Sequence, residues 1–135
     1  MSWILDTNVV SALMRSDART SGRLLALSPR EVMVPQPVIA EIRYGLVRLP
    51  LSRRRTMLER RFGLLARSLR RAEWTDDVSH HFGTIKAGLE RSGARIEDFD
   101  VAIAAHALAY GATLATGNLR HFAAVEGLKA ESWIV

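Results

Sequence analysis

The sequence predicts an α/β domain built on a mainly parallel sheet. Short apolar runs such as Trp3-Ile4-Leu5 have the length and character of buried strands. Segments with apolar residues at helical spacing separate these runs along the chain. Because helices connect neighbouring parallel strands, this alternation is the order expected of an α/β fold.

The first half of the chain predicts two strands and four helices. Proline residues set several boundaries, since Pro29 and Pro50 each end a helical pattern and Pro35 and Pro37 introduce one. In chain order we expect a strand at residues 3–5, a helix capped by Thr7 or Asn8 and continuing through Leu13, a helix from Ser21 to Leu27, a strand at residues 32–34, a helix over residues 38–49, and an Arg-rich helix whose apolar stripe runs from Leu58 to Leu69.

The second half predicts three strands and two helices. Negative charge at Asp76-Asp77 favours a helix start, and Gly93 and Gly111 favour helix ends. In chain order we expect a short strand at residues 72–74, a helix from Asp76 to about Arg91, a helix capped by Asp98 and continuing through Ala109, a strand at residues 113–116, and a last strand at residues 132–135.

Length and composition indicate one domain over residues 1–135. A chain of this size buries roughly 68–70% of the surface that its unfolded form exposes, which is enough for a core. No internal repeat or Gly/Ser-rich linker divides it. No apolar run approaches the roughly 20 residues that span a bilayer. The N-terminus has no basic segment, and Asp6 interrupts any signal-peptide core, so we expect a cytoplasmic protein without a membrane partner.

The sequence contains no cysteine. Disulfides and thiolate metal sites are therefore excluded, and carboxylate oxygens and histidine nitrogens are left as metal ligands.

The basic residues are unevenly distributed. The formal net charge is +5, and residues 52–71 hold eight arginines against one acidic residue, Glu59. Arginine has a planar set of donors that suits phosphates, and such a block attracts polyanions. A solvated helix face explains the same pattern equally well.

Polar residues follow two of the expected buried strands, with Asp6 after the first and Thr116 at the end of a later one. In open parallel sheets, sites form beyond the carboxyl ends of the strands at the point where the strand order reverses. Glu41 lies in the helix after the second strand, and Gly45 leaves open space beside it. Asp100 lies in the first turn of an Ala-rich helix, whose N-terminal dipole stabilises an anion.

Carboxylates that converge from three segments repel one another unless a cation lies between them. Mg²⁺ prefers such oxygen ligands and can lower the pKa of a bound water for attack on phosphorus. Each residue also has an ordinary interpretation: Asp6 as a helix cap, Glu41 as an exposed helix residue, and Asp98 or Asp100 as the cap of the last helix, a role we assign to Asp98. Spacing alone therefore indicates a basic α/β domain with a candidate metal site.

Five sequence blocks, in the same order and across the whole chain, resemble the PIN-domain family, in particular VapC-type toxins of toxin–antitoxin pairs. They are residues 4–10 (ILDTNVV, similar to hLDTNhh), 38–45 (VIAEIRYG, similar to xxxAELxxG), 99–107 (FDVAIAAHA, similar to xDxxIAAxA), 114–122 (LATGNLRHF, similar to hhTxNxxxF), and Gly127-Leu128 with Trp133 (similar to GL…W).

This resemblance implies a three-layer α/β/α fold with a central mainly parallel sheet, and a ribonuclease that depends on Mg²⁺ or Mn²⁺. It implies that Asp6 and Asp100 are the main metal ligands and that Glu41 acts directly or through a water. The polar residues expected around these acids, where they orient the carboxylates, are Thr7, Asn8, Asp98, Thr116 and Asn118. Many PIN domains carry a fourth acid where this chain has Asn118, so the resemblance leaves open whether one or two ions act.

The resemblance also implies an RNA substrate, a homodimer and a small antitoxin protein that lies along the active-site groove. Apolar positions of the Val38–Leu49 and Leu58–Leu69 helices are candidates for that groove, although most must serve the core. His121 occupies a position that is often acidic in the family, where it can approach RNA phosphate. The arginines expected to contact RNA are Arg43, Arg53, Arg54, Arg55 and Arg120.

Two other functions compete with the ribonuclease. A basic RNA-binding domain with a vestigial acidic site would bind RNA through Arg53–Arg71 in a salt-sensitive manner and leave its length unchanged. A phosphatase of the haloacid dehalogenase type also has Asp after a strand, but its chemistry needs a second Asp where this chain has Asn8. The sequence does not identify the RNA target, the antitoxin or the preferred metal.

Overall fold

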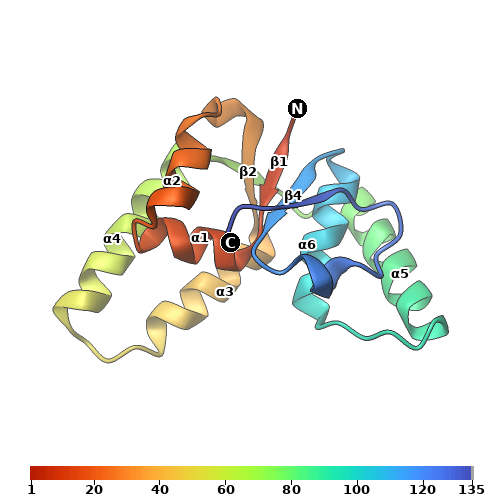
Figure 1. Cartoon of the computed structure of the whole chain (residues 1–135). Coiled ribbons are helices and arrows are strands. Elements are labelled where there is room, and N and C mark those ends of the chain that lie inside the picture. Colours follow the sequence, from red (N-terminus) through yellow and green to blue (C-terminus); the bar gives the residue numbers. More distant parts are fainter. Residues whose placement is uncertain (135) are drawn as a thin grey trace.

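A five-stranded sheet organises the chain (Figure 1). The computed structural model describes residues 1–134. The strand order is β3-β2-β1-β4-β5, and all four strand pairings are parallel, so the predicted sheet is confirmed. The strands are β1 (Trp3–Leu5), β2 (Val32–Pro35), β3 (Arg70–Ala72), β4 (Thr113–Thr116) and β5 (Ala130–Ser132).

Helices cover both faces of the sheet, which confirms the predicted three-layer architecture. Figure 1 shows α1 to α4 on one side and α5 and α6 on the other. The helices are α1 (Thr7–Met14), α2 (Ala18–Leu25), α3 (Gln36–Val47), α4 (Arg53–Ser68), α5 (Asp76–Arg91) and α6 (Asp98–Ala109), with short 3-10 helices η1 (Pro29–Glu31) and η2 (Leu119–Phe122).

The core lies between the central strands and both helical layers. Ile4, Leu5 and Leu114 are fully buried, as expected for central parallel strands. The predicted close packing of the Ala-rich helix is also confirmed, since four of its alanines are buried: Ala102, Ala104, Ala105 and Ala107.

None of the helices within residues 1–134 combines the length and apolar character needed to cross a membrane.

Two predicted helix caps are wrong. Asp6, rather than Thr7 or Asn8, caps α1, which confirms its ordinary interpretation as a helix cap, and its side chain accepts a hydrogen bond from the Thr7 amide at 2.8 Å. Asp98 does not cap α6, because it is the first residue of the helix and Glu97 occupies the N-cap position. The Asp98 carboxylate is exposed and instead lies 3.0 Å from the Lys86 ammonium.

Three predicted boundaries are displaced. α2 begins before Ser21, because Asp17 caps it by accepting a hydrogen bond from the Thr20 amide at 3.0 Å. β3 precedes the expected position, since α4 ends at Ser68 and residues 70–72 pair with β2. The last strand is β5 (Ala130–Ser132) rather than residues 132–135, of which Val135 lies outside the described residues.

Candidate active site

The candidate site lies at the carboxyl ends of β1 and β4, where the strand order reverses. The chain leaves β1 for β2 on one side, while β4 pairs with β1 on the other. The Asp6 amide donates to the Ala115 carbonyl at 2.9 Å, so the pairing of β1 with β4 extends to the first acidic residue. The sheet topology therefore fixes Asp6 and Thr116 side by side, at the predicted location.

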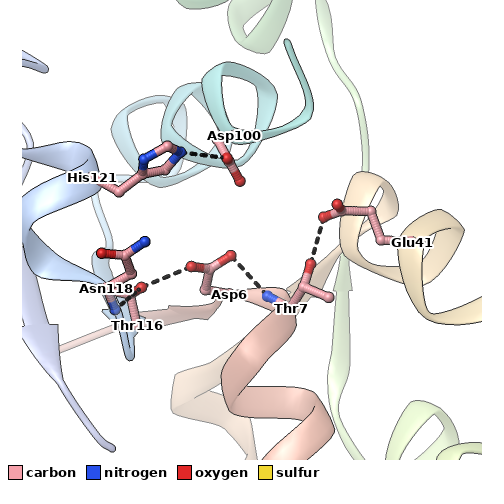
Figure 2. A network of polar contacts seen from close by, with 7 residues as sticks. All are labelled: Asp6, Thr7, Glu41, Asp100, Thr116, Asn118 and His121. Carbon is pink, nitrogen blue, oxygen red and sulfur yellow. Dashed lines mark hydrogen bonds and ion pairs between the residues drawn. The ribbon is translucent and has the colours of Figure 1, made fainter. Parts of the chain in front are cut away.

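Both carboxylate oxygens of Asp6 have donors, although only 4% of this residue is exposed (Figure 2). Oδ1 accepts from the Thr7 amide at 2.8 Å, and Oδ2 accepts from the Thr116 hydroxyl at 2.7 Å. The Thr116 hydroxyl oxygen in turn accepts from the Asn118 amide at 3.0 Å. Asp6 is therefore held in one orientation by the start of α1, the end of β4 and the loop that follows.

Thr7 also connects Asp6 to Glu41 on α3. Its hydroxyl donates to Oε1 of Glu41 at 2.5 Å. A Cβ added at Gly45 would meet no heavy atom within 4 Å, so the predicted open space beside Glu41 is present. Glu41 is half-buried at the border between α1 and α3.

Asp100 enters the site from α6, on the opposite layer. Its Oδ2 lies 2.7 Å from Nε2 of His121, which η2 carries (Figure 2). The sequence prediction for His121 concerned RNA phosphate and missed this contact. The resemblance offered a signal for it, because the family often has an acidic residue at this position.

A pocket of about 410 Å³ brings these residues together. The three acids, Asp6, Glu41 and Asp100, all line it, as do four of the other polar residues discussed above: Thr7, Asn8, Asn118 and His121. Sequence reasoning missed Ser11 and Arg15, which also line it. Their signal was periodicity, because Thr7, Ser11 and Arg15 recur every four residues along α1 and its C-cap.

Asp98, in contrast, does not line this pocket, and its ion pair with Lys86 accounts for its carboxylate. The prediction that Asp98 orients the acidic residues is therefore wrong, and its carboxylate instead joins α6 to α5. Spacing alone did not show which of Asp98 and Asp100 faces the other acids, because both lie in the first turn of the same helix.

Burial and mutual repulsion make the site unfavourable for negative charge. Burial raises the pKa of Asp6, the Thr116 and Thr7 hydrogen bonds oppose the shift, and the Asp100 charge adds to it. Burial also raises the pKa of Glu41, opposed by the Thr7 hydrogen bond and increased by the charges of Asp100 and Asp6. A cation in the pocket would relieve both the burial cost and the repulsion.

The donor set of the pocket fits a hard divalent cation that keeps part of its water shell. Within residues 1–134, no three acidic or histidine side chains are close enough to hold one ion by themselves. Mg²⁺ is commonly bound through one or two carboxylates together with waters and substrate phosphate. Asp6 and Asp100, with Glu41 reached through a water, would supply ligands of this kind.

Asn8 has a different role from the acids. Its side-chain oxygen accepts from the Gly117 amide at 2.9 Å and so holds the loop after β4. A Cβ at Gly117 would lie 2.9 Å from Cδ1 of Ile134, so a larger residue there would displace the Ile134 side chain. Asn8 is thus committed to the loop, in the position where a haloacid dehalogenase-type phosphatase would need its second Asp.

The five arginines expected to contact RNA lie in different environments. The Arg43 guanidinium lies over the Phe62 ring, 5.1 Å from its centroid. Arg55 donates to the Leu49 carbonyl at 3.0 Å and pairs with Glu59. Arg53, Arg54 and Arg120 are exposed. Of the five, Arg55 already has N–H donors engaged within the chain, which weakens the expectation that it contacts RNA.

The model of the PIN domain family matches residues 3–128 of this chain. The chain is also 30% identical to "Ribonuclease VapC2" from Haemophilus influenzae, over 99% of each chain. This chain is a PIN-domain protein of the VapC family. "tRNA(fMet)-specific endonuclease VapC" from Shigella flexneri is 26% identical to it, over 98% of each chain.

A solved structure shares the fold of this PIN domain. The crystal structure of VapBC2 from Rickettsia felis, bound to a DNA fragment from their promoter, matches with a TM-score of 0.88 and 24% identity, over 98% of this chain and 99% of that one. The fold and family implied by the sequence blocks are therefore confirmed.

Proposed function

We propose that this chain, as one PIN domain over residues 1–135, is a metal-dependent endoribonuclease and the toxin of a VapBC-type toxin–antitoxin pair. The observation that carries the proposal is the convergence of Asp6, Glu41 and Asp100 from three separate elements on one pocket. The family supports RNA as the substrate, because the names of the relatives given above describe enzymes that cut RNA.

In this proposal Asp6 and Asp100 hold Mg²⁺ or Mn²⁺ directly, and Glu41 acts directly or through a water. The bound ion would polarise the scissile phosphate and lower the pKa of the attacking water. Thr7 and Thr116 fix the Asp6 carboxylate, so its oxygens need no rearrangement when the substrate arrives. His121 would orient Asp100, and Glu41, if it acts through a water, would accept a hydrogen bond from that water and align it.

We propose two protein partners for this chain. The first is a small antitoxin that covers the pocket and places a cationic side chain on the acids, whose unfavourable negative charge such a group would relieve. The second is another copy of the chain, forming a homodimer as the resemblance implies. Light scattering on the purified toxin, alone and with its antitoxin, measures both assemblies, and a monomer at micromolar concentration would contradict the homodimer.

The proposed activity is tested with purified, antitoxin-free protein and total cellular RNA. The reactions contain Mg²⁺ or Mn²⁺, with an EDTA control and the Asp100→Asn variant, and new RNA ends are mapped. Discrete ends that require both the metal and Asp100 are expected. Absence of new ends from folded, metal-binding protein would contradict the nuclease and favour the RNA-binding alternative.

A further inference from the structure

A groove of about 410 Å³ adjoins the acidic pocket. α1, α3 and α4 form it, and the apolar residues that line it are Met14, Ile42, Leu46, Leu49 and Leu58. Four residues line both spaces: Thr7, Ser11, Arg15 and Glu41. The groove is thus a continuation of the pocket rather than a separate site, with Thr7 and Glu41 at the border.

The charged residues of this groove suit a polyanion. Arg15, Arg48 and Arg54 line it, against a single carboxylate from Glu41. All three arginines are exposed, and none forms an ion pair with another residue in the 1–134 range. Such guanidinium groups offer planar donors that match phosphate oxygens.

An exposed aromatic side chain stands among these cations. Tyr44 lines the groove, and 67% of the residue is exposed. The Arg48 guanidinium lies over its ring at 5.4 Å from the centroid. A cationic groove with an accessible aromatic ring is the arrangement that binds single-stranded nucleic acids, because the ring stacks on a base while the cations contact phosphates.

We propose that this groove binds the single-stranded RNA next to the scissile phosphate, with Arg15, Arg48 and Arg54 on phosphates and Tyr44 stacked on a base. The inference rests on the proposed nuclease function and deepens it. Thr7 begins α1 and Arg15 is its C-cap, eight residues further on, or about 12 Å along the helix axis. Arg15 therefore reaches a phosphate that lies beyond the one held at the acids, on the same strand.

The test measures RNA binding separately from cleavage. All variants are made in the Asp100→Asn background, and the affinity for a labelled, mixed-sequence single-stranded RNA is measured by fluorescence anisotropy across a range of salt concentrations. Arg15→Gln and Arg48→Gln should each reduce the slope of log K against log salt by roughly 0.7, and Arg15→Lys should restore it. Tyr44→Ala should weaken binding by roughly fivefold or more, whereas Tyr44→Phe should not.

Arg91→Gln is the matched control, because Arg91 is exposed in the last turn of α5, in the opposite layer. It should leave affinity and slope unchanged. Groove variants that bind RNA like the control, in a protein whose unmutated form cleaves RNA, would overturn the inference and leave the nuclease intact. The same holds if they lose only affinity for the antitoxin. If the groove variants lose RNA binding but the unmutated protein never cleaves RNA, the result would contradict the nuclease and leave the groove inference intact.

Discussion

The two halves of the acidic site are built differently. Asp6 is buried, and both of its oxygens accept hydrogen bonds, one from a backbone amide and the other from the fully buried Thr116. Asp100 is partly exposed, and its contact is with the partly exposed side chain of His121. One carboxylate is therefore fixed by groups at the start of α1 and the end of β4, and the other is held by a partly exposed side chain. Removing a side chain that holds the carboxylate should therefore affect fold and chemistry together in the first half, and chemistry alone in the second.

The largest effect is expected from Asp6→Asn. Cleavage should fall by more than roughly a hundredfold, the upper range for groups that only orient a metal ligand. Stability of the metal-free protein at neutral pH should stay equal or rise, because Asn still caps α1 and the buried charge is gone. Parallel RNA cleavage and thermal unfolding assays measure both, and retained cleavage would remove Asp6 from the site.

Thr116→Val should be the most destabilising change in the first half. It leaves Oδ2 of Asp6 without its donor and the Asn118 amide without its acceptor, in a fully buried position. The expected loss of unfolding free energy is about 1–3 kcal/mol, with a loss of cleavage. Thr116→Ser keeps the hydroxyl and is the control. Equal stability of the Val and Ser variants would show that the hydroxyl does not hold Asp6.

His121→Ala tests the second half. Metal affinity should fall by roughly tenfold, at the lower end for a residue that orients a ligand, because Asp100 loses its partner. Stability should change little, since the pair is partly exposed. Mn²⁺ titration followed by electron paramagnetic resonance measures affinity without requiring activity. His121→Ala with unchanged Mn²⁺ affinity but much lower stability would contradict the contrast between the two halves.

The same contrast explains what the sequence predicted and what it did not. Asp6 and Thr116 were predictable because buried strands end there, and parallel strands end at one edge of a sheet. The roles of His121 and Arg15 were not, because they depend on how η2 meets α6 and how α1 meets α3. Asp98 was misassigned because the first turn of α6 holds two acidic residues. Only the packing of α6 on α5 shows that Asp98 is the one that pairs with Lys86.

The prediction of the last strand was wrong for a related reason. Residues 132–135 are apolar apart from Ser132 and have the composition of a buried strand. In the structure Trp133 is buried against Trp3, 5.3 Å between ring centroids, beyond the end of β5. Its burial reflects a side-chain contact with β1, which periodicity alone does not distinguish from strand pairing.

The smallest expected effect is on the pH dependence of stability without metal. Burial raises the pKa of both Asp6 and Glu41, so the folded state binds their protons more tightly than the unfolded state does. The stability from these two groups is therefore present at low pH and is lost as the pH rises through the raised pKa values. Asp6→Asn should flatten this decline. Saturating Mg²⁺ should reverse it, because the ion favours the charged carboxylates and its binding competes with protons. Thermal unfolding from acidic to neutral pH, with EDTA or with Mg²⁺, measures the difference, and identical profiles under both conditions would show that the ion does not bind these acids.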